Sequence, residues 1–390
     1  MAIVINGSGT LTGVSQGGLP DASVDNDTLA SGISASKLTG SLPAINGSAL
    51  TNLPSTSTAD ILSAAQLTYT DSYNIGLGSG SLGAITTGDY NIAVGRYALD
   101  STTEGSNNVS IGYGTMDGNT TGSSNVALGR SALTANTTAS NNTAIGYYAL
   151  VSNTTGEHNV AVGKDAGASN TTGGSNSSLG AGALYTNTTG GNNTAIGDSA
   201  LNSATTASNN TAVGGSALRA NTTGAAQTAV GKGALTANTT GTKNNAFGVN
   251  SLEANTTGSE NLGAGKDSLQ SNTTASYNTG LGFEALKSNT TGGNNTAVGH
   301  TALRGNTTAE GNVAVGYGCG RAITTGASNV AIGYNTAYQL TTGSSNIVIG
   351  HDAGAALTTG HSNTAIGKNS GNDITTGYKN TFVGLLAGQT

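Results

Sequence analysis

The architecture of this chain can be read from one short stretch, Asn193-Thr194-Ala195-Ile196-Gly197-Asp198-Ser199-Ala200-Leu201. The pattern returns every seventeen residues, and its glycine recurs from Gly78 and Gly95 to Gly384 without an insertion or deletion. Such a fixed period is typical of one supersecondary unit stacked on copies of itself, because neighbouring units supply the core that one unit cannot build alone. We therefore predict an all-β rod, a parallel β-solenoid or β-roll of nineteen 17-residue coils.

Each coil is predicted to contain a short β-strand that ends at the periodic glycine. The residue four before the glycine is Asn in almost every coil, the residue two before it is nearly always small, and the residue one before it is apolar, in most coils branched or Leu. Alternate residues of a strand face opposite sides. We expect the branched side chains to fill the coil and the small ones to form a flat face that another chain can approach. The predicted coil core comprises Val94, Ile111, Leu128, Ile145 and Val162, with Leu99, Leu133 and Leu150 from four residues after the glycine.

The remaining part of each coil is predicted to hold a second short strand and two turns. Segments such as Asn153-Thr154-Thr155-Gly156 suit corners, because Gly and Asn accept a left-handed backbone. Stacking by about 4.8 Å per coil gives a rod on the order of 90 Å long. In-register Asn and Thr side chains are expected to form ladders of hydrogen bonds, which would satisfy groups that are costly to bury.

The composition excludes an ordinary globular domain. Only 8% of the residues are charged and 4% are aromatic, so a coil has few bulky side chains with which to offset chain entropy. A disordered chain of similar composition would not keep one register through nineteen copies. All three prolines lie in the first 54 residues, and proline interrupts a continuous sheet. We divide the chain into an N-terminal module (1–55), a connector (56–70) and the rod (71–390).

Several classes of function are not expected. The net charge is −6 and the basic residues are scattered singly, which argues against nucleic acid as a partner. No apolar run is long enough for membrane insertion, and the N-terminus does not resemble a secretory signal. The four histidines lack the spacing of metal ligands, no catalytic constellation is present, and no cofactor is predicted. Cys319 is expected to be a small buried filler.

The residue directly after each periodic glycine varies most and is often large and polar, which is typical of a solvent-facing position. A solvated face without a ligand is one interpretation. The other is that the rod binds glycans through aromatic and basic side chains, for which the candidate contacts are Arg96, Tyr97, Tyr113, Tyr147, Tyr148, Tyr317 and Tyr334. From Gly316 onward, the Leu four after the glycine is replaced by Gly or Ala, and an apolar residue appears three positions later. We interpret this as a rearranged core near one end of the rod rather than as a ligand site, because no polar constellation accompanies the change.

The recurring pattern Asn-x-Ala-(Val/Ile)-Gly resembles the head repeats of trimeric autotransporter adhesins, over the span from about Asn74 to Thr390. That resemblance implies a left-handed β-roll and a homotrimer packed around a common axis. The chain departs from the family because its period is longer and because neither a secretory signal nor a C-terminal barrel anchor is evident.

The first 54 residues resemble the N-terminal regions of tail-fibre proteins from marine and cyanobacterial phages. The resemblance rests on Ile5-Asn6-Gly7-Ser8-Gly9-Thr10, Gly17-Gly18-Leu19-Pro20 and the stretch from Leu42-Pro43 to Leu53-Pro54. It implies a virion fibre assembled in the host cytoplasm, with the N-terminal module docked on other virion proteins. The rod would then project toward the host surface, where a glycan or protein is the expected partner. A separate tip protein at the C-terminus, a cleaved chain and a truncated chain all fit the sequence.

Two other functions remain open at this stage. Thr-Thr recurs in nearly every coil, which suggests an ice-binding solenoid, although adjacent strand residues place only one rank of Thr on each face. A bacterial surface adhesin is the other alternative, and it needs a non-classical route of export.

Overall fold

The computed structural model describes residues 4–5, 11–12, 67–70 and 73–389. The chain forms two compact units, Met1–Ser57 and Thr58–Thr390. In the first unit, β1 (Val4–Ile5) pairs antiparallel with β2 (Leu11–Thr12). The rest of the predicted N-terminal module (1–55), and the connector as far as residue 66, lies outside the described residues.

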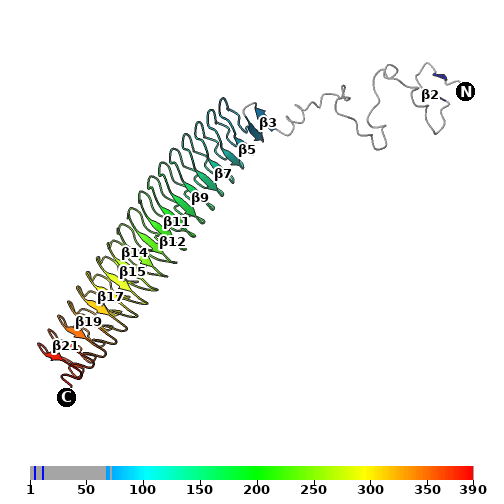
Figure 1. Cartoon of the computed structure of the whole chain (residues 1–390). Coiled ribbons are helices and arrows are strands. Elements are labelled where there is room, and N and C mark those ends of the chain that lie inside the picture. Colours follow the sequence, from blue (N-terminus) through cyan, green and yellow to red (C-terminus); the bar gives the residue numbers. More distant parts are fainter. Residues whose placement is uncertain (1–3, 6–10, 13–66, 71–72, 390) are drawn as a thin grey trace. The chain divides into compact units, whose positions relative to one another are not determined.

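The second unit is a β-solenoid, which confirms the predicted fold class (Figure 1). Its first parallel strand is β4 (Asn74–Leu77), and every later strand is three residues long. These strands are β5 (Ile92–Val94), β6 (Val109–Ile111), β7 (Val126–Leu128), β8 (Thr143–Ile145), β9 (Val160–Val162), β10 (Ser177–Leu179), β11 (Thr194–Ile196), β12 (Thr211–Val213), β13 (Thr228–Val230), β14 (Asn245–Phe247), β15 (Leu262–Ala264), β16 (Thr279–Leu281), β17 (Thr296–Val298), β18 (Val313–Val315), β19 (Val330–Ile332), β20 (Ile347–Ile349), β21 (Thr364–Ile366) and β22 (Thr381–Val383).

Consecutive strands pair in parallel with a constant offset of one coil. β11 and β12, for example, align Ala195 with Ala212 and Ile196 with Val213. At the first coil, β3 (Leu67–Thr70) lies antiparallel to β4 and covers its edge, so part of the predicted connector belongs to the sheet. At the other end, β22 pairs with β21 and with no other strand of the described chain.

Each coil contains one strand rather than the two predicted. The segment around the periodic leucine is a series of turns, because Ser199 and Leu201 have φ values of 55° and 50°, in the left-handed region. Backbone hydrogen bonds between coils continue there nonetheless, from Leu201 N–H to Ala217 C=O at 3.0 Å. The coils are therefore hydrogen-bonded to one another beyond the strands.

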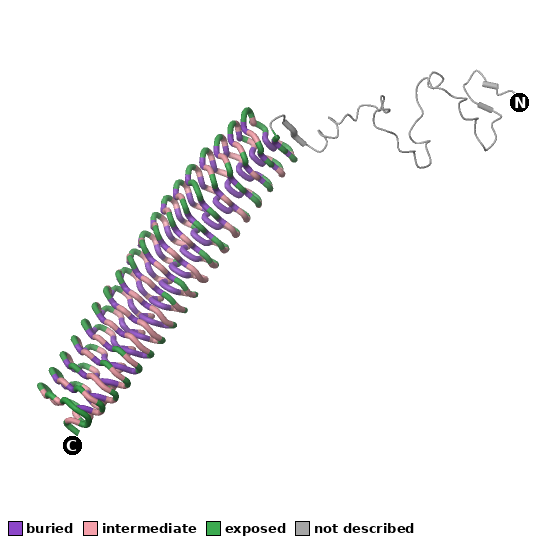
Figure 2. The backbone as a smooth tube through the Cα atoms, viewed as in Figure 1, coloured by how far each residue is buried: buried purple, intermediate pink, exposed green. Residues whose placement is uncertain are grey.

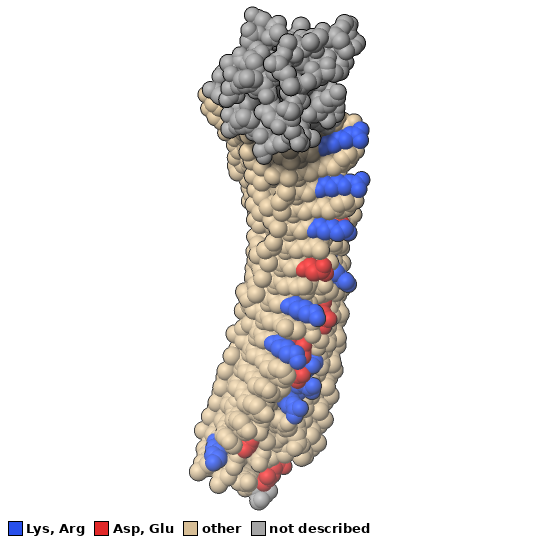
Figure 3. Space-filling model, turned by 90° about the vertical axis from the view of Figure 1, so that its right-hand side faces the viewer, with Lys and Arg blue, Asp and Glu red and all other residues tan. Residues whose placement is uncertain are grey.

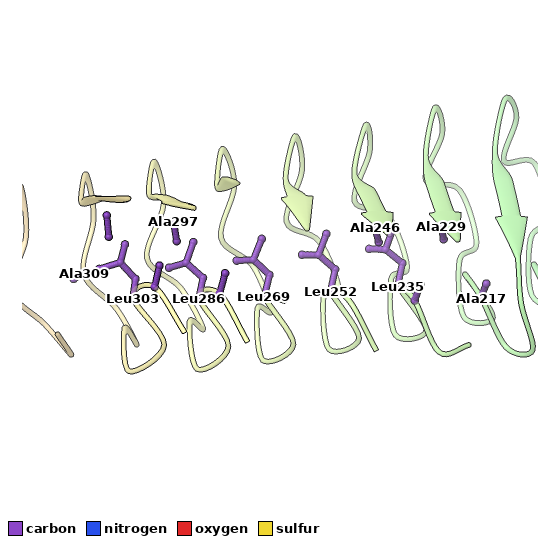
Figure 4. Close-up of a cluster of buried hydrophobic side chains, with 14 of the residues drawn as sticks. Ala217, Ala229, Leu235, Ala246, Leu252, Leu269, Leu286, Ala297, Leu303 and Ala309 are labelled. Atoms are coloured by element: carbon purple, nitrogen blue, oxygen red, sulfur yellow. The ribbon is translucent and has the colours of Figure 1, made fainter. Parts of the chain in front are cut away.

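The two faces of the strand are oriented opposite to the prediction. The small residues point into the coil, as Ala229 and Ala246 do toward the leucines of the opposite wall (Figure 4), and Ala195 and Leu201 are fully buried. Buried residues recur along the whole solenoid (Figure 2), and the branched residues of the strands lie on the opposite, more exposed side. Ile111 and Leu128 are 38% and 44% exposed. The assignment of five residues to the coil core was therefore wrong: Val94, Ile111, Leu128, Ile145 and Val162. The assignment of three leucines was right, since Leu99, Leu133 and Leu150 are buried.

The physical reason is the thinness of the coil. The Leu from the opposite wall already fills the interior, and only a small side chain such as Ala or Ser fits beside it on the strand. Gly263 and Gly280 show how little space remains, since they stand at the strand position that most coils fill with Ala. In the coil before each of them, Ser251 or Ser268 replaces a buried Ala and adds an oxygen atom to the core. A Cβ at Gly263 would lie 2.5 Å from Ser251 Oγ, and this hydroxyl donates to Gly263 C=O at 3.0 Å. The interior therefore holds a nearly fixed volume in each coil.

The predicted Asn ladder is present and runs along the start of every strand. Asn91 Oδ1 accepts a hydrogen bond from the Asn108 backbone N–H at 3.0 Å, and Asn91 Nδ2 donates to Gly105 C=O at 2.8 Å. Each buried side chain thus joins one coil to the next and also closes its own corner. Gln227 is the single departure, and its Nε2 donates instead to Asn221 Oδ1.

A second buried Asn ladder lies seven residues after the periodic glycine. Asn136 Nδ2 donates to Asn119 Oδ1 at 2.7 Å, and the same contact recurs from coil to coil. The ladder stops where the next coil has no Asn. The Oδ1 atoms of Asn187 and Asn306 have no hydrogen-bond partner, because the following positions are Ala204 and Ile323.

The last coils are a rearranged version of the same core, as predicted. Gly320 and Gly354 replace the periodic leucine, and Ile323 and Leu357 from the second Asn position fill the space while remaining buried. The apolar side chain has moved from one corner of the coil to another, so the interior stays filled.

Candidate interaction surfaces

The first candidate surface is the outward side of the sheet, which we call the outward face. It consists of the residues one and three before each periodic glycine, and none of them is charged in any of the nineteen coils. Its exposed large members follow the whole solenoid: Ile75, Leu77, Ile92, Ile111, Val126, Leu128, Val160, Leu179, Ile196, Val230, Phe247, Val315, Ile332, Ile347, Ile366 and Val383. The residue one before the glycine is apolar in all nineteen coils, whereas the residue three before it is apolar in nine and Thr, Ser or Asn in ten. An unbroken file of apolar side chains of this length is characteristic of an interface rather than of a solvated side.

The second candidate surface is the flank file, defined as the residues that directly follow the periodic glycines. It begins where the strands end, so it borders the outward face. Half of the basic residues of the described solenoid lie in it, at Arg96, Arg130, Lys164, Lys232, Lys266 and Lys368. Figure 3 shows basic side chains following one side of the solenoid. In the linear sequence these basic residues look scattered, because the 17-residue period brings them into one file only when the coils are stacked.

Five of the predicted glycan contacts cluster in the first part of the flank file and beside it. The Tyr97 and Tyr113 rings meet edge to face at 6.2 Å, and the Tyr147 and Tyr148 rings lie 4.0 Å apart. Arg96 donates a hydrogen bond to Tyr97 Oη at 2.8 Å, which raises the pKa of its guanidinium. The structure thus brings these residues together on one edge of neighbouring coils.

The other two predicted contacts, Tyr317 and Tyr334, lie in what we call the ring stack. Five consecutive residues of the flank file stack face to face with centroid distances of 5.0 to 5.1 Å: Phe283, His300, Tyr317, Tyr334 and His351. Both faces of Tyr317 and of Tyr334 lie against neighbouring rings, although the two residues remain 48% and 46% exposed. The stack stabilises the packing of successive coils, as stacked aromatic side chains do in other in-register sheets.

A network of ion pairs lies beside the start of the ring stack. Glu284 contacts Lys287 at 2.7 Å and Arg304 at 2.6 Å, and Lys287 also approaches Asp267 at 3.5 Å. The hydrogen bond from Lys287 lowers the pKa of Glu284, and Arg304 adds to the effect. These cations are already paired, so they contribute little to the attraction of an external anion.

The Thr-Thr pairs form two ranks with different roles. Hydroxyls of the first rank donate to the carbonyl of the next coil, as Thr188 Oγ1 does to Thr205 C=O at 3.0 Å. The second rank, which includes Thr189 and Thr206, is exposed. A single exposed rank is therefore available at this corner, as the spacing in the sequence indicates.

Other chemistry-bearing groups form no site in the described residues. No three His, Cys, Asp or Glu side chains lie close enough there to hold a metal ion. Cys319 is buried as predicted, and burial raises the pKa of its thiol. Across the part of the chain that the structure describes, no helix is long and apolar enough to cross a membrane.

Comparison with protein-family models, with characterised proteins and with solved structures found no match to this chain. The assignment of function therefore rests on the two surfaces.

Proposed function

We propose that this chain is a structural and adhesive homotrimeric fibre of a phage virion. In this proposal the N-terminal module (1–55) docks on other virion proteins, and the solenoid projects to reach or bind the host surface. The single observation that carries the proposal is the outward face, an uncharged and largely apolar surface that follows the sheet from β4 to β22.

Copies of the same chain are the partners that suit this face best. Successive coils of the outward face are about 4.8 Å apart. The face has no charged side chain that could bind a polar ligand. Only a partner with the same rise can keep its side chains in register over nineteen coils. Three copies around an axis would bury all three outward faces and leave the flank files near the grooves between chains, and the adhesin resemblance favours this number.

Attachment by the N-terminal module is supported by its resemblance to phage fibre proteins. The division of the chain at Ser57 agrees with a separate role for this segment. Exposed tyrosines and basic residues of the flank file support adhesion by the rod itself, because such side chains suit carbohydrate recognition.

The proposed function is tested by electron microscopy of phage particles from a lysate of the producing host, labelled with an antibody against the solenoid. We expect the label on fibres that project from the particles. Intact chain on the surface of uninfected cells would contradict the virion assignment and favour a bacterial adhesin. A clear thermal-hysteresis activity of the purified chain would favour the ice-binding alternative, which the single exposed Thr rank does not support.

A further inference from the structure

Five consecutive coils carry a regular alternation of cation and tyrosine in the flank file. We call Arg96, Tyr113, Arg130, Tyr147 and Lys164 the cation–tyrosine array. The alternation has a period of two coils, twice that of the fold. Nothing in the fold requires it, because the flank position accepts Asp, Gly and Val in other coils.

The side chains of the array alternate in space as they do in sequence. The Arg130 guanidinium carbon lies 5.7 Å from the Tyr113 ring centroid and 5.9 Å from the Tyr147 ring centroid. Tyr113 is 49% exposed and Tyr147 is 38% exposed. Because a cation separates the two rings, they do not close into a stack of the kind seen from Phe283 to His351.

Two of the three cations of the array carry no ion pair within the described residues. Arg96 contacts the Tyr97 hydroxyl, and Arg130 lies against the two rings. Lys164 differs, since it pairs with Asp165 at 2.9 Å. The guanidinium groups of Arg96 and Arg130 are therefore the ones that can bind an external anion.

We propose that the cation–tyrosine array binds a linear acidic polysaccharide that lies along the solenoid and carries one carboxylate or sulfate per disaccharide. Cations two coils apart are separated by about 10 Å, and the intervening tyrosine occupies the coil between them. One sugar unit of a polysaccharide is about as long as the rise from one coil to the next. Acidic sugars can therefore contact the arginines while the sugars between them contact Tyr113 and Tyr147. Arg is suited to this ligand because its planar guanidinium group can form bidentate hydrogen bonds with a carboxylate or a sulfate.

The proposal rests on the proposed adhesive function and specifies its ligand class. A nucleic acid fits the array less well, because it presents a phosphate at every nucleotide and is bound by a continuous basic groove. Here only every second coil supplies a cation, and the whole chain carries a net charge of −6.

The test uses the full-length purified protein and isothermal titration calorimetry at low salt. The probes are ten-sugar fragments of hyaluronan, which carries one carboxylate per disaccharide, and of κ-carrageenan, which carries one sulfate per disaccharide. A neutral maltodextrin and a ten-nucleotide single-stranded DNA serve as comparisons. We expect binding of at least one acidic probe and weaker or absent binding of the two comparison probes. Binding should weaken as salt is raised, because the contacts are exposed.

Two matched double variants each remove two positive charges from the flank file, one variant within the cation–tyrosine array and the other outside it. Arg96→Gln with Arg130→Gln should weaken binding of the acidic probe by about tenfold, whereas Lys232→Gln with Lys368→Gln should change it by less than about twofold. Tyr113→Ser with Tyr147→Ser should also weaken binding without a change in net charge. All six side chains are at least one-third exposed, so the thermal unfolding midpoint serves as the control for folding.

Failure of both acidic probes to bind, equal binding of the maltodextrin, or equal losses in the two charge variants would each overturn the proposal. Tighter binding of DNA would assign the array to nucleic acid instead. None of these outcomes bears on the fibre itself, since labelling of virions and the number of associated chains are measured separately.

Discussion

At the scale of single residues, the periodic glycine is the one position at which the fold allows no side chain. Gly214 has a φ of 131°, and a Cβ there would lie 2.6 Å from the carbonyl carbon of Gly231 in the next coil. The other left-handed positions have φ values near 50° to 60° and accept Leu, Ser or Asn, as Leu201 and Ser199 show. The strict recurrence of glycine thus reflects both backbone angle and contact between coils.

The adjacent glycines Gly214 and Gly215 provide a matched pair of substitutions. Gly214→Ala should destabilise the solenoid by about 3 kcal/mol, because the strained angle and the backbone overlap add. Gly215→Ala should change the stability by less than about 0.5 kcal/mol, since nothing lies within 4 Å of the added methyl group. Chemical unfolding followed by circular dichroism measures both values, and equal effects of the two changes would contradict this account.

The fixed interior volume predicts a compensating pair at Ser251 and Gly263. Gly263→Ala alone should cost about 1 to 2 kcal/mol, because its methyl group overlaps Ser251 Oγ. Adding Ser251→Ala restores the Ala–Ala combination of other coils and should recover most of the loss. A double-mutant cycle from unfolding free energies measures the coupling, and strictly additive effects would show that the two residues do not share the interior.

At the scale of the coil, hydrogen bonds between buried amides stabilise a structure that lacks the large apolar core of a globular domain. Each ladder Asn both donates and accepts, so that burial leaves few polar atoms unpaired. The interruptions coincide with the unpaired Oδ1 atoms of Asn187 and Asn306. Each of these two gaps in the ladder therefore leaves one buried amide oxygen without a hydrogen bond.

Filling one gap should stabilise the solenoid. Ala204→Asn places an amide between Asn187 and Asn221, where it can donate to Asn187 Oδ1 as its counterparts do in other coils. We expect a gain of about 1 kcal/mol, the usual net contribution of a hydrogen bond. The matched control is Ala200→Asn, which puts an amide at a buried position without a ladder and should be destabilising. A loss of stability in Ala204→Asn, measured by chemical unfolding, would show that the site cannot accommodate the amide.

Much of the coil could be predicted from the sequence, because the period and the Asn positions are explicit in it. The parallel register, the Asn ladders and the buried Leu99 were all predicted correctly. The orientation of the strand was not, since alternation separates two faces without showing which one is internal. That choice is made by the volume left beside the periodic leucine, a property of the closed coil. The sequence also predicted a strand where Leu201 adopts a left-handed backbone, a conformation that Leu rarely takes.

At the scale of the whole solenoid, the outward face is the feature that a single chain leaves unexplained. Ile196→Asp with Val230→Asp should prevent association, because two charges per chain would be buried in the interface. The monomeric coil should remain folded, since Ile196 and Val230 are 38% and 37% exposed in one chain. Sedimentation velocity measures association, and circular dichroism checks the fold.

The matched control places the same charges at the same two-coil spacing on the exposed Thr rank, as Thr189→Asp with Thr223→Asp. This variant should associate like the unmodified chain. If both variants, or neither, lose association, the outward face is not the interface.

The candidate contacts predicted from the sequence do lie in or beside the flank file. Their separation into the ring stack and the cation–tyrosine array was not predicted. Tyr317 and Tyr113 occupy equivalent positions and are similarly exposed, yet the first lies between two stacked rings and the second beside a cation. The difference depends on which residues occupy the neighbouring coils. It becomes visible only when residues seventeen positions apart are placed side by side.

The most direct test of the central claim is the molar mass of the purified protein by light scattering, in native buffer and in strong denaturant. We predict a native mass of about three times the 37.8 kDa of one chain, falling to a single chain only under harsh denaturing conditions. A native mass of one chain would contradict the trimeric fibre and leave the outward face exposed in a solitary solenoid.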